Sequence, residues 1–326
     1  MNLETDAMLV SLRIRAWSGR IHDRGVSDRV AAEHEAGAGA GRYHKRLLPK
    51  DALAALAATI SAARKTHFAQ TLPWDDQGNR LLTVANHENY TALMDGLRER
   101  MVRERARFLA DFEANIGRAR IELGGLFREA DYPAPETLRD RFSLRWRIQP
   151  APAAEHFIAK LATADTDRVR RDIERRIGER LGEALADLYR RLGAAVGHVA
   201  ERLREDGDGK PLVFRDSLIE NVRDIVEVAP KLNLFGDENL ARLCEEVKEK
   251  IAAVEPDALR PSRAFDPKTR ARVKRDADEL LERFSGYFGT GGAAADGGAG
   301  DAPAGPASVA AGGGFPIAGD PRREAA

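Results

Sequence analysis

The sequence predicts a mainly α-helical protein, in which two long helices form an antiparallel, coiled-coil-like hairpin, with additional helices and a small two-stranded β element. Two apolar stripes are the main basis for this prediction. Apolar side chains recur mostly three, four or seven residues apart over 86–127 and again over 165–204. Each stripe is typical of an amphipathic helix, about 60 Å long at 1.5 Å per residue. Neither stripe is stable in water, and prolines at 133 and 135 let the chain reverse between them, so we expect the two helices to pack on each other.

Two segments, 9–16 and 142–148, have the period of a β-strand instead. In both, apolar residues alternate with serine and arginine, which is typical of a strand with one buried face. Two isolated strands of the same character most simply pair with each other. Such a pair would join the beginning of the chain to the bend of the hairpin. The expected pairing places Leu12 and Ile14 beside Leu144 and Trp146.

The remaining elements follow from capping residues, period and turn chemistry. Ser27 is a suitable N-cap, Pro49 can open a helix, and Pro230 is expected to end one. Runs rich in Gly, Asp, Asn and Pro indicate turns and loops. The expected shorter helices are 27–35, 49–70, a helix ending at Pro230, 238–253 and 267–287, and the expected loops are 36–41, 71–82 and 205–211.

Three regions follow from these elements: a helical body over 1–255, a basic C-terminal helical segment over 256–288 and a tail over 289–326. In the tail, 27 of 38 residues are Gly, Ala or Pro, which cannot offset the entropy of ordering, so we expect disorder. Its main apolar cluster is Phe315, Pro316 and Ile317. This cluster is a candidate docking peptide, and a plain solubilising tail is the alternative.

Bulk composition limits the functional classes. Lys plus Arg equals Asp plus Glu, 52 against 52, so no overall charge favours nucleic acid or an acidic membrane. The single cysteine, Cys244, excludes an internal disulfide framework. The acidic, arginine-interrupted start does not resemble a signal peptide, and no apolar run approaches the length of a membrane span. We therefore expect a cytoplasmic protein.

No segment matches a known catalytic arrangement. The stretch GDGKP at 207–211 has Pro211 where a phosphate loop needs Ser or Thr, and no two histidines have the i, i+4 spacing that places both on one metal. Asp75 to Asn79 resembles a calcium-loop fragment without its distal Glu. The sequence therefore predicts no catalytic, cofactor-binding or metal-binding residues and a protein that is not an enzyme. An enzyme with ligands scattered along the chain remains open as an alternative.

Local charge is more informative than total charge. The segment 260–275 holds seven cations and one acid, whereas 212–257 holds eleven acids and six cations. The basic segment therefore either binds phosphate groups or pairs with the neighbouring acidic stretch. Arginines of the two strands would share one sheet face, where opposed like charges are unfavourable unless something anionic covers them. The candidate phosphate or partner contacts are Arg260, Arg263, Lys268, Arg270, Arg272, Lys274 and Arg275, the strand residues Arg13, Arg15, Arg145 and Arg147, and in addition Arg42, Lys45 and Arg46.

Five further blocks of the sequence are distinctive: WSGR (17–20), HKRLLPKDAL (44–53), TLPWDDQGNRLL (71–82), LFREADYP (126–133) and FRDSLIENVRDIVEVAPKLNL (214–234). Together they resemble an uncharacterised family, a domain of unknown function, from tailed bacteriophages, prophages and integrative elements of proteobacteria. The resemblance covers roughly 10–255 and implies a bacterial host cell. In such elements the family is often encoded near a MoxR-like AAA+ ATPase and a von Willebrand A-type protein, so the resemblance implies these partners and no reaction.

Two functional hypotheses follow. The first is a non-enzymatic helical adaptor or assembly protein of phage or mobile-element origin, which binds a protein partner. The second is a nucleic-acid-binding accessory protein that uses 260–275 with help from the strand arginines. Self-association into a homo-oligomer is compatible with both.

Overall fold

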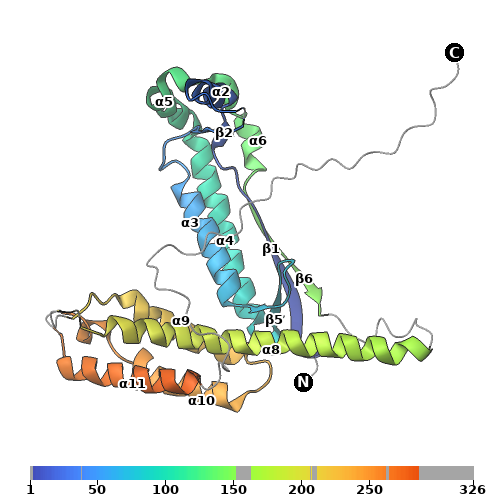
Figure 1. Cartoon of the computed structure of the whole chain (residues 1–326), viewed down its shortest axis with the longest axis vertical. Helices are drawn as coiled ribbons and strands as arrows, with labels where there is room; N and C mark the ends of the chain where they lie inside the picture. Colours follow the sequence, from blue (N-terminus) through green and yellow to red (C-terminus); the bar gives the residue numbers. More distant parts are fainter. Residues whose placement is uncertain are drawn as a thin grey trace. The chain divides into compact units, whose positions relative to one another are not determined.

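A computed structural model describes residues 3–37, 39–151, 163–205, 207, 211–261 and 264–285. These residues are mostly helical, with one four-stranded and one two-stranded antiparallel sheet (Figure 1). The predicted mainly α class is therefore confirmed. The β part is larger than the single pair of strands that the sequence predicted.

The main sheet has the strand order β4-β5-β1-β6. Its strands are β1 (Ala7–Arg15), β4 (Leu72–Pro73), β5 (Asn79–Thr83) and β6 (Ser143–Pro150), with the short α1 (Leu3–Asp6) directly before β1.

The expected pairing of β1 and β6 is confirmed, and the structure supplies its register. Leu12 lies opposite Trp146, and Ile14 lies opposite Leu144, in an antiparallel register. A shift of one residue would move the apolar side chains of a strand to the other face of the sheet. The alternation of apolar and basic residues therefore sets both the pairing and the face that is buried.

The segment 71–82, predicted as a turn, is instead a β-hairpin formed by β4 and β5. Within its tight bend, Asp75 Oδ1 accepts hydrogen bonds from the backbone N–H groups of Gln77 at 2.9 Å and Asn79 at 3.0 Å. Gly78 adopts a φ of +89°, which a side chain would disfavour. The two strands of this hairpin are short, and one contains a proline. The alternation of apolar and polar residues was therefore not enough to reveal them in the sequence.

A second, two-stranded sheet pairs β2 (Arg20–His22) with β3 (His44–Arg46). Between them lies α2 (Arg24–Glu33), which begins earlier than predicted because Asp23, not Ser27, is its N-cap. The Asp23 Oδ1 atom accepts a hydrogen bond of 3.1 Å from the Val26 N–H.

A first group of helices covers one face of the main sheet. The stripe predicted as one helix over 86–127 is divided at Asp111 into two α-helices, followed by 3-10 turns. The elements are α3 (Ala54–Ala69), α4 (Val84–Ala110), α5 (Phe112–Leu123), η1 (Gly124–Leu126), η2 (Glu129–Asp131) and α6 (Pro135–Arg139).

A second group of helices follows β6. The stripe over 165–204 forms one continuous helix, as predicted, and Pro230 lies within the last turn of the next helix instead of ending it. The elements are α8 (Thr163–Arg202), α9 (Asp216–Leu232), α10 (Glu238–Val247), the π-helical turn η3 (Lys248–Ala252), η4 (Pro256–Ala258) and α11 (Pro267–Ser285).

The long antiparallel hairpin is not confirmed. Helix α4 packs chiefly on α3, whereas α8 packs chiefly on α11 and α9, so each stripe is covered by a different partner. An amphipathic stripe specifies that an apolar surface must cover it, but it does not specify which surface. The shorter helices supply that cover for both.

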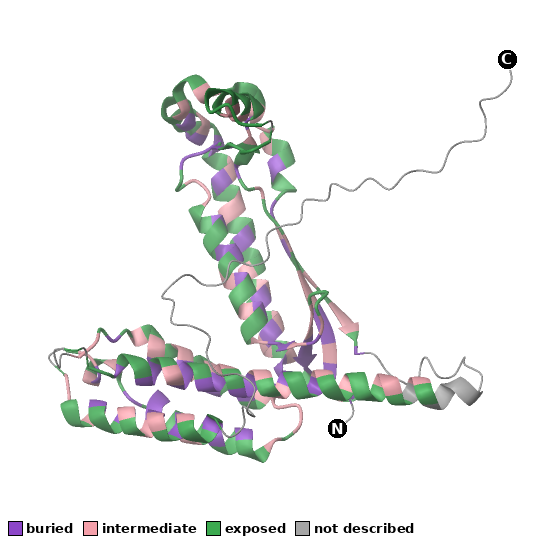
Figure 2. Ribbon diagram, in the orientation of Figure 1, coloured by how far each residue is buried: buried purple, intermediate pink, exposed green. Residues whose placement is uncertain are grey.

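The core consists of two apolar clusters that meet at the main sheet (Figure 2). On β1, Val10 faces the cluster built around α3 and α4, and its neighbour Leu9 faces the cluster built around α8 to α11. On β5, Leu82 and Leu81 divide in the same way. Because successive side chains of a strand point to opposite faces, the sheet joins the two clusters.

The chain divides into two units, Met1–Phe288 and Gly289–Ala326. Residues 256–288 belong to the first unit, where α11 packs on α8. The predicted tail and its docking peptide, Phe315, Pro316 and Ile317, lie outside the described residues. Among the helices that the structure describes, none combines the length and the apolar character that a membrane span requires.

Candidate functional site

Four exposed arginines lie on one face of the β1–β6 pair: Arg13, Arg15, Arg145 and Arg147. We call this surface the arginine face. Arg13 lies directly opposite Arg145, and Arg147 lies opposite Ser11. The structure therefore brings together the four strand arginines that the sequence singled out.

The opposite face of the same strands explains why these arginines point outward. There, Trp146 packs edge-on against Tyr90 of α4, with ring centroids 6.4 Å apart. The Arg98 guanidinium, also from α4, lies 5.2 Å from the centroid of the Trp146 ring. Since the apolar side chains are held against α4, alternation leaves the arginines on the other face.

No carboxylate lies within ion-pair distance of any of these four arginines in the described parts of the chain. Like charges directly opposite each other on a sheet are destabilising, by roughly 0.2–1 kcal/mol for one such pair. The arginine face also borders an edge, since β6 is the last strand of the sheet. One side of its backbone therefore has no strand partner among the residues that the structure describes.

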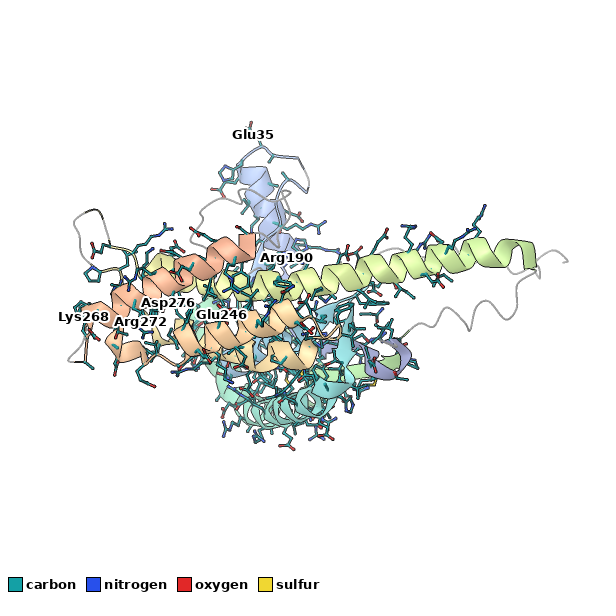
Figure 3. The ribbon with its side chains drawn as sticks, turned by 90° about the horizontal axis from the view of Figure 1, so that it is seen from below. Glu35, Arg190, Glu246, Lys268, Arg272 and Asp276 are labelled. Atoms are coloured by element: carbon teal, nitrogen blue, oxygen red, sulfur yellow. The ribbon has the colours of Figure 1, made fainter. Side chains whose placement is uncertain are left out.

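Three cations of the basic segment 260–275 form ion pairs within the chain, and one of them, Arg272, is labelled with its partner Asp276 in Figure 3. Arg260 pairs with Asp216 at 3.0 Å and with Asp257, and Arg272 pairs with Asp276 at 3.6 Å. Lys274 pairs with Asp278. These cations therefore follow the alternative prediction, in which the basic segment pairs within the chain. Two of the four carboxylates, however, come from α11 itself and not from the acidic stretch.

Arg270 is buried, with 6% of its surface exposed. Its guanidinium donates hydrogen bonds to the backbone carbonyls of Arg202 at 3.0 Å, Arg204 at 3.3 Å and Leu259. Burial lowers the pKa of Arg270, and Glu205 opposes this change. Its position indicates a role in joining α11 to the end of α8. Of the remaining candidates, Lys268 and Arg275 are exposed without a carboxylate at ion-pair distance in the described residues, and Arg263 lies outside them.

Lys45 is not available to bind nucleic acid, because only 1% of its side chain is exposed. Its Nζ atom lies 3.3 Å from Asp23 and 2.5 Å from Asp131, and it donates a 2.7 Å hydrogen bond to the Leu126 carbonyl. The pKa of Asp23 is lowered, first by its hydrogen bond from Val26 and then by Lys45. We call Lys45, Asp23 and Asp131 the buried ion cluster. Arg42 and Arg46 are exposed, as predicted for cations that contact a partner.

The described residues contain no group of three or more His, Cys, Asp or Glu side chains placed to hold a metal. Cys244 is buried, and burial together with Glu245 raises the pKa of its thiol to about 11. A thiol of this kind is a poor nucleophile at neutral pH.

Comparison with known proteins found no match: neither a protein-family model, nor a curated protein, nor a solved structure is similar to this chain. The resemblance to the phage family therefore remains a prediction.

Proposed function

We propose that the protein is a non-enzymatic adaptor or assembly protein that binds an acidic surface of a partner protein through the arginine face. The observation that carries the proposal is the direct opposition of Arg13 and Arg145 on an exposed sheet face, with no carboxylate at ion-pair distance among the residues that the structure describes. Such an arrangement is unfavourable in the free protein and becomes favourable once anionic groups cover it.

The edge strand supports a protein as the partner. The unpaired backbone side of β6 can receive an added strand, whose carboxylate side chains would then lie beside Arg145 and Arg147. A guanidinium and a carboxylate form two parallel hydrogen bonds, which supply both energy and orientation. Backbone pairing and charge would thus act on the same segment of the partner.

The resemblance noted above suggests the identity of the partner. For a protein of phage or mobile-element origin in the bacterial cytoplasm, the MoxR-like AAA+ ATPase and the von Willebrand A-type protein are the first candidates. A second copy of this chain is the third candidate, and it would make the protein a homo-oligomer.

Replacing Arg13 and Arg145 together by glutamine is expected to weaken capture of the partner by about tenfold or more. The same change removes the opposed charges and should leave the free energy of unfolding unchanged or slightly raised. The affinity is measured by titration of the purified ATPase and von Willebrand A-type protein, and stability is measured by urea unfolding.

The matched control replaces two exposed arginines elsewhere, Arg64 of α3 and Arg100 of α4, by glutamine. Neither has an ion-pair partner within the described ranges. This variant should retain the affinity of the wild type. Equal affinities of the wild type and both variants would exclude the arginine face as the binding surface. So would a wild type that captures neither partner and is monomeric in solution.

Nucleic-acid binding is the alternative. Of the candidate cations in the described residues, those that remain exposed for it are the arginine face, Lys268, Arg275, Arg42 and Arg46. It predicts affinity for DNA or RNA that falls steeply with salt. Charge reversal at Lys268 and Arg275 tests it more cleanly than reversal at Arg270, which would disturb the buried contacts of that residue. Unchanged binding of DNA and RNA by both this variant and the Arg13 and Arg145 variant would exclude the alternative.

A further inference from the structure

A cavity of about 850 Å³ lies where α3, α4 and β5 meet α8 and α9. None of its lining residues belongs to the arginine face. Its volume falls within the range of roughly 300–1,000 Å³ that is usual for small-molecule sites in proteins. The cavity is therefore large enough to hold a small ligand. Such a ligand would not contact the arginine face.

One wall of the cavity is apolar. Phe68 near the end of α3 and Leu93 of α4 remain 55% and 42% exposed, although both are large apolar side chains. Ile225 and Val228 of α9 continue this wall. Apolar surface exposed inside a concave site gains free energy when a ligand covers it.

Arg80 of β5 supplies a charge beside this wall. Its Nε and Nη2 atoms donate to the hydroxyl of Thr71 at 2.7 Å and to the Thr71 carbonyl at 3.0 Å. The guanidinium lies 4.5 Å from the centroid of the Phe68 ring. These contacts hold Arg80 in place, and no carboxylate lies at ion-pair distance from it among the described residues.

A second guanidinium converges on the same carbonyl. Arg191 of α8 donates to the Thr71 carbonyl at 2.9 Å, and it pairs with Asp187 at 2.5 Å. Asp187 also pairs with Arg190, at 3.6 Å. Asp187, whose charge also acts on Arg80, is therefore already paired with two other arginines.

Arg80 is therefore a partly buried cation without a carboxylate at ion-pair distance in the part of the chain that the structure describes. Burial, and then the nearby Arg191, lower its pKa to about 10, while the charge of Asp187 acts in the opposite direction, so Arg80 remains protonated at neutral pH. Removing a charge from water is costly unless an opposite charge compensates it. An anionic group in the cavity would provide that compensation.

Polar amides border the apolar wall. The side-chain oxygen of Gln70 accepts hydrogen bonds from Asn86 at 3.0 Å and from Asn89 at 2.9 Å. This network fixes the position of Gln70 and Asn89 at the cavity. A few fixed polar groups beside an apolar wall are typical of sites that orient a ligand.

We propose that this cavity binds a small organic anion, whose acidic group pairs with Arg80 and whose flat apolar body lies against Phe68 and Leu93. The proposal is independent of the arginine face, and either can fail without the other.

The test uses two fluorescent probes with the same aromatic skeleton in titrations of the full chain. One is 8-anilinonaphthalene-1-sulfonate, which is anionic, and the other is N-phenyl-1-naphthylamine, which is neutral. Arg80→Gln is expected to weaken binding of the anionic probe by about tenfold or more and to change binding of the neutral probe by less than about twofold. The matched control is Arg98→Gln, which removes another arginine stacked on an aromatic ring, outside the cavity.

A second variant tests the proposal even if Arg80→Gln fails to fold. Leu93→Glu adds a negative charge at an exposed position of the cavity wall, without removing a hydrogen bond of Arg80. Leu93→Glu should weaken binding of the anionic probe. Val102→Glu, at a comparably exposed position of α4 outside the cavity, should leave that binding unchanged. The proposal is overturned if the wild type shows no saturable binding of the anionic probe, or if the folded cavity variants bind it as well as their controls do.

Discussion

Replacing Lys45 by alanine should lower the free energy of unfolding by about 3 kcal/mol. The substitution removes the only cation of the buried ion cluster and leaves Asp23 and Asp131 close together without it. It also removes the hydrogen bond to the Leu126 carbonyl, which links β3 to the connection after α5. Urea unfolding followed by circular dichroism measures the loss.

The matched control is Arg118→Ala, which breaks the exposed ion pair between Arg118 and Asp51 at 2.9 Å. Exposed pairs contribute little, so this variant should lose much less stability. A double variant, Lys45→Met with Asp131→Asn, should recover part of the loss because it removes charge of both signs. Equal losses in the Lys45 and Arg118 variants would show that the buried ion cluster has no special role.

Lowering the pH from 7 to 5 should destabilise the protein by about 2 kcal/mol through His67 alone. His67 is 3% exposed, and its Nδ1 atom lies 3.0 Å from the Tyr90 hydroxyl. Burial, and then the nearby Arg80, lower its pKa from 6.5 to about 4. Below pH 6.5 the unfolded chain binds a proton that the folded chain cannot bind until near pH 4. Stability is therefore lost as the pH falls between these values.

The variant His67→Gln isolates this contribution. Glutamine keeps a polar group near Tyr90 and does not titrate. The difference in the free energy of unfolding between the wild type and the variant should therefore change by about 2 kcal/mol between pH 7 and pH 5. Unfolding midpoints in urea at several pH values measure it. Parallel pH profiles for the two proteins would contradict a buried, neutral His67.

The strand pair was predictable because its signal is local. Alternation over 9–16 and 142–148 determines which side chains share a face, and Leu12 and Ile14 lie beside Leu144 and Trp146 as expected. The position of Arg13 and Arg145 on one exposed face follows directly from it. The hairpin of β4 and β5 was missed because its strands are shorter than the window in which a period of two can be recognised.

In the basic segment, the sequence did not predict which cations are buried. Charge alone could not distinguish Arg270, which is buried against backbone carbonyls, from Lys268, which is exposed two residues earlier. Lys45 was likewise grouped with Arg46 as a surface cation, although β3 turns its side chain to the opposite face. For single cations, burial depends on partners far along the chain, such as Asp131.

By itself, the sequence determined the mainly helical class, the two strands, their pairing and the arginine face that follows from it. These depend on periods within short segments and on the steric preferences of the residues concerned. Only the tertiary structure decided that α4 and α8 pack on different helices, that Lys45 closes an ion cluster and that Arg80 borders a cavity. The physical reason is that the apolar stripe of an amphipathic helix can be buried against any apolar surface. Which surface buries it depends on how all the elements pack together.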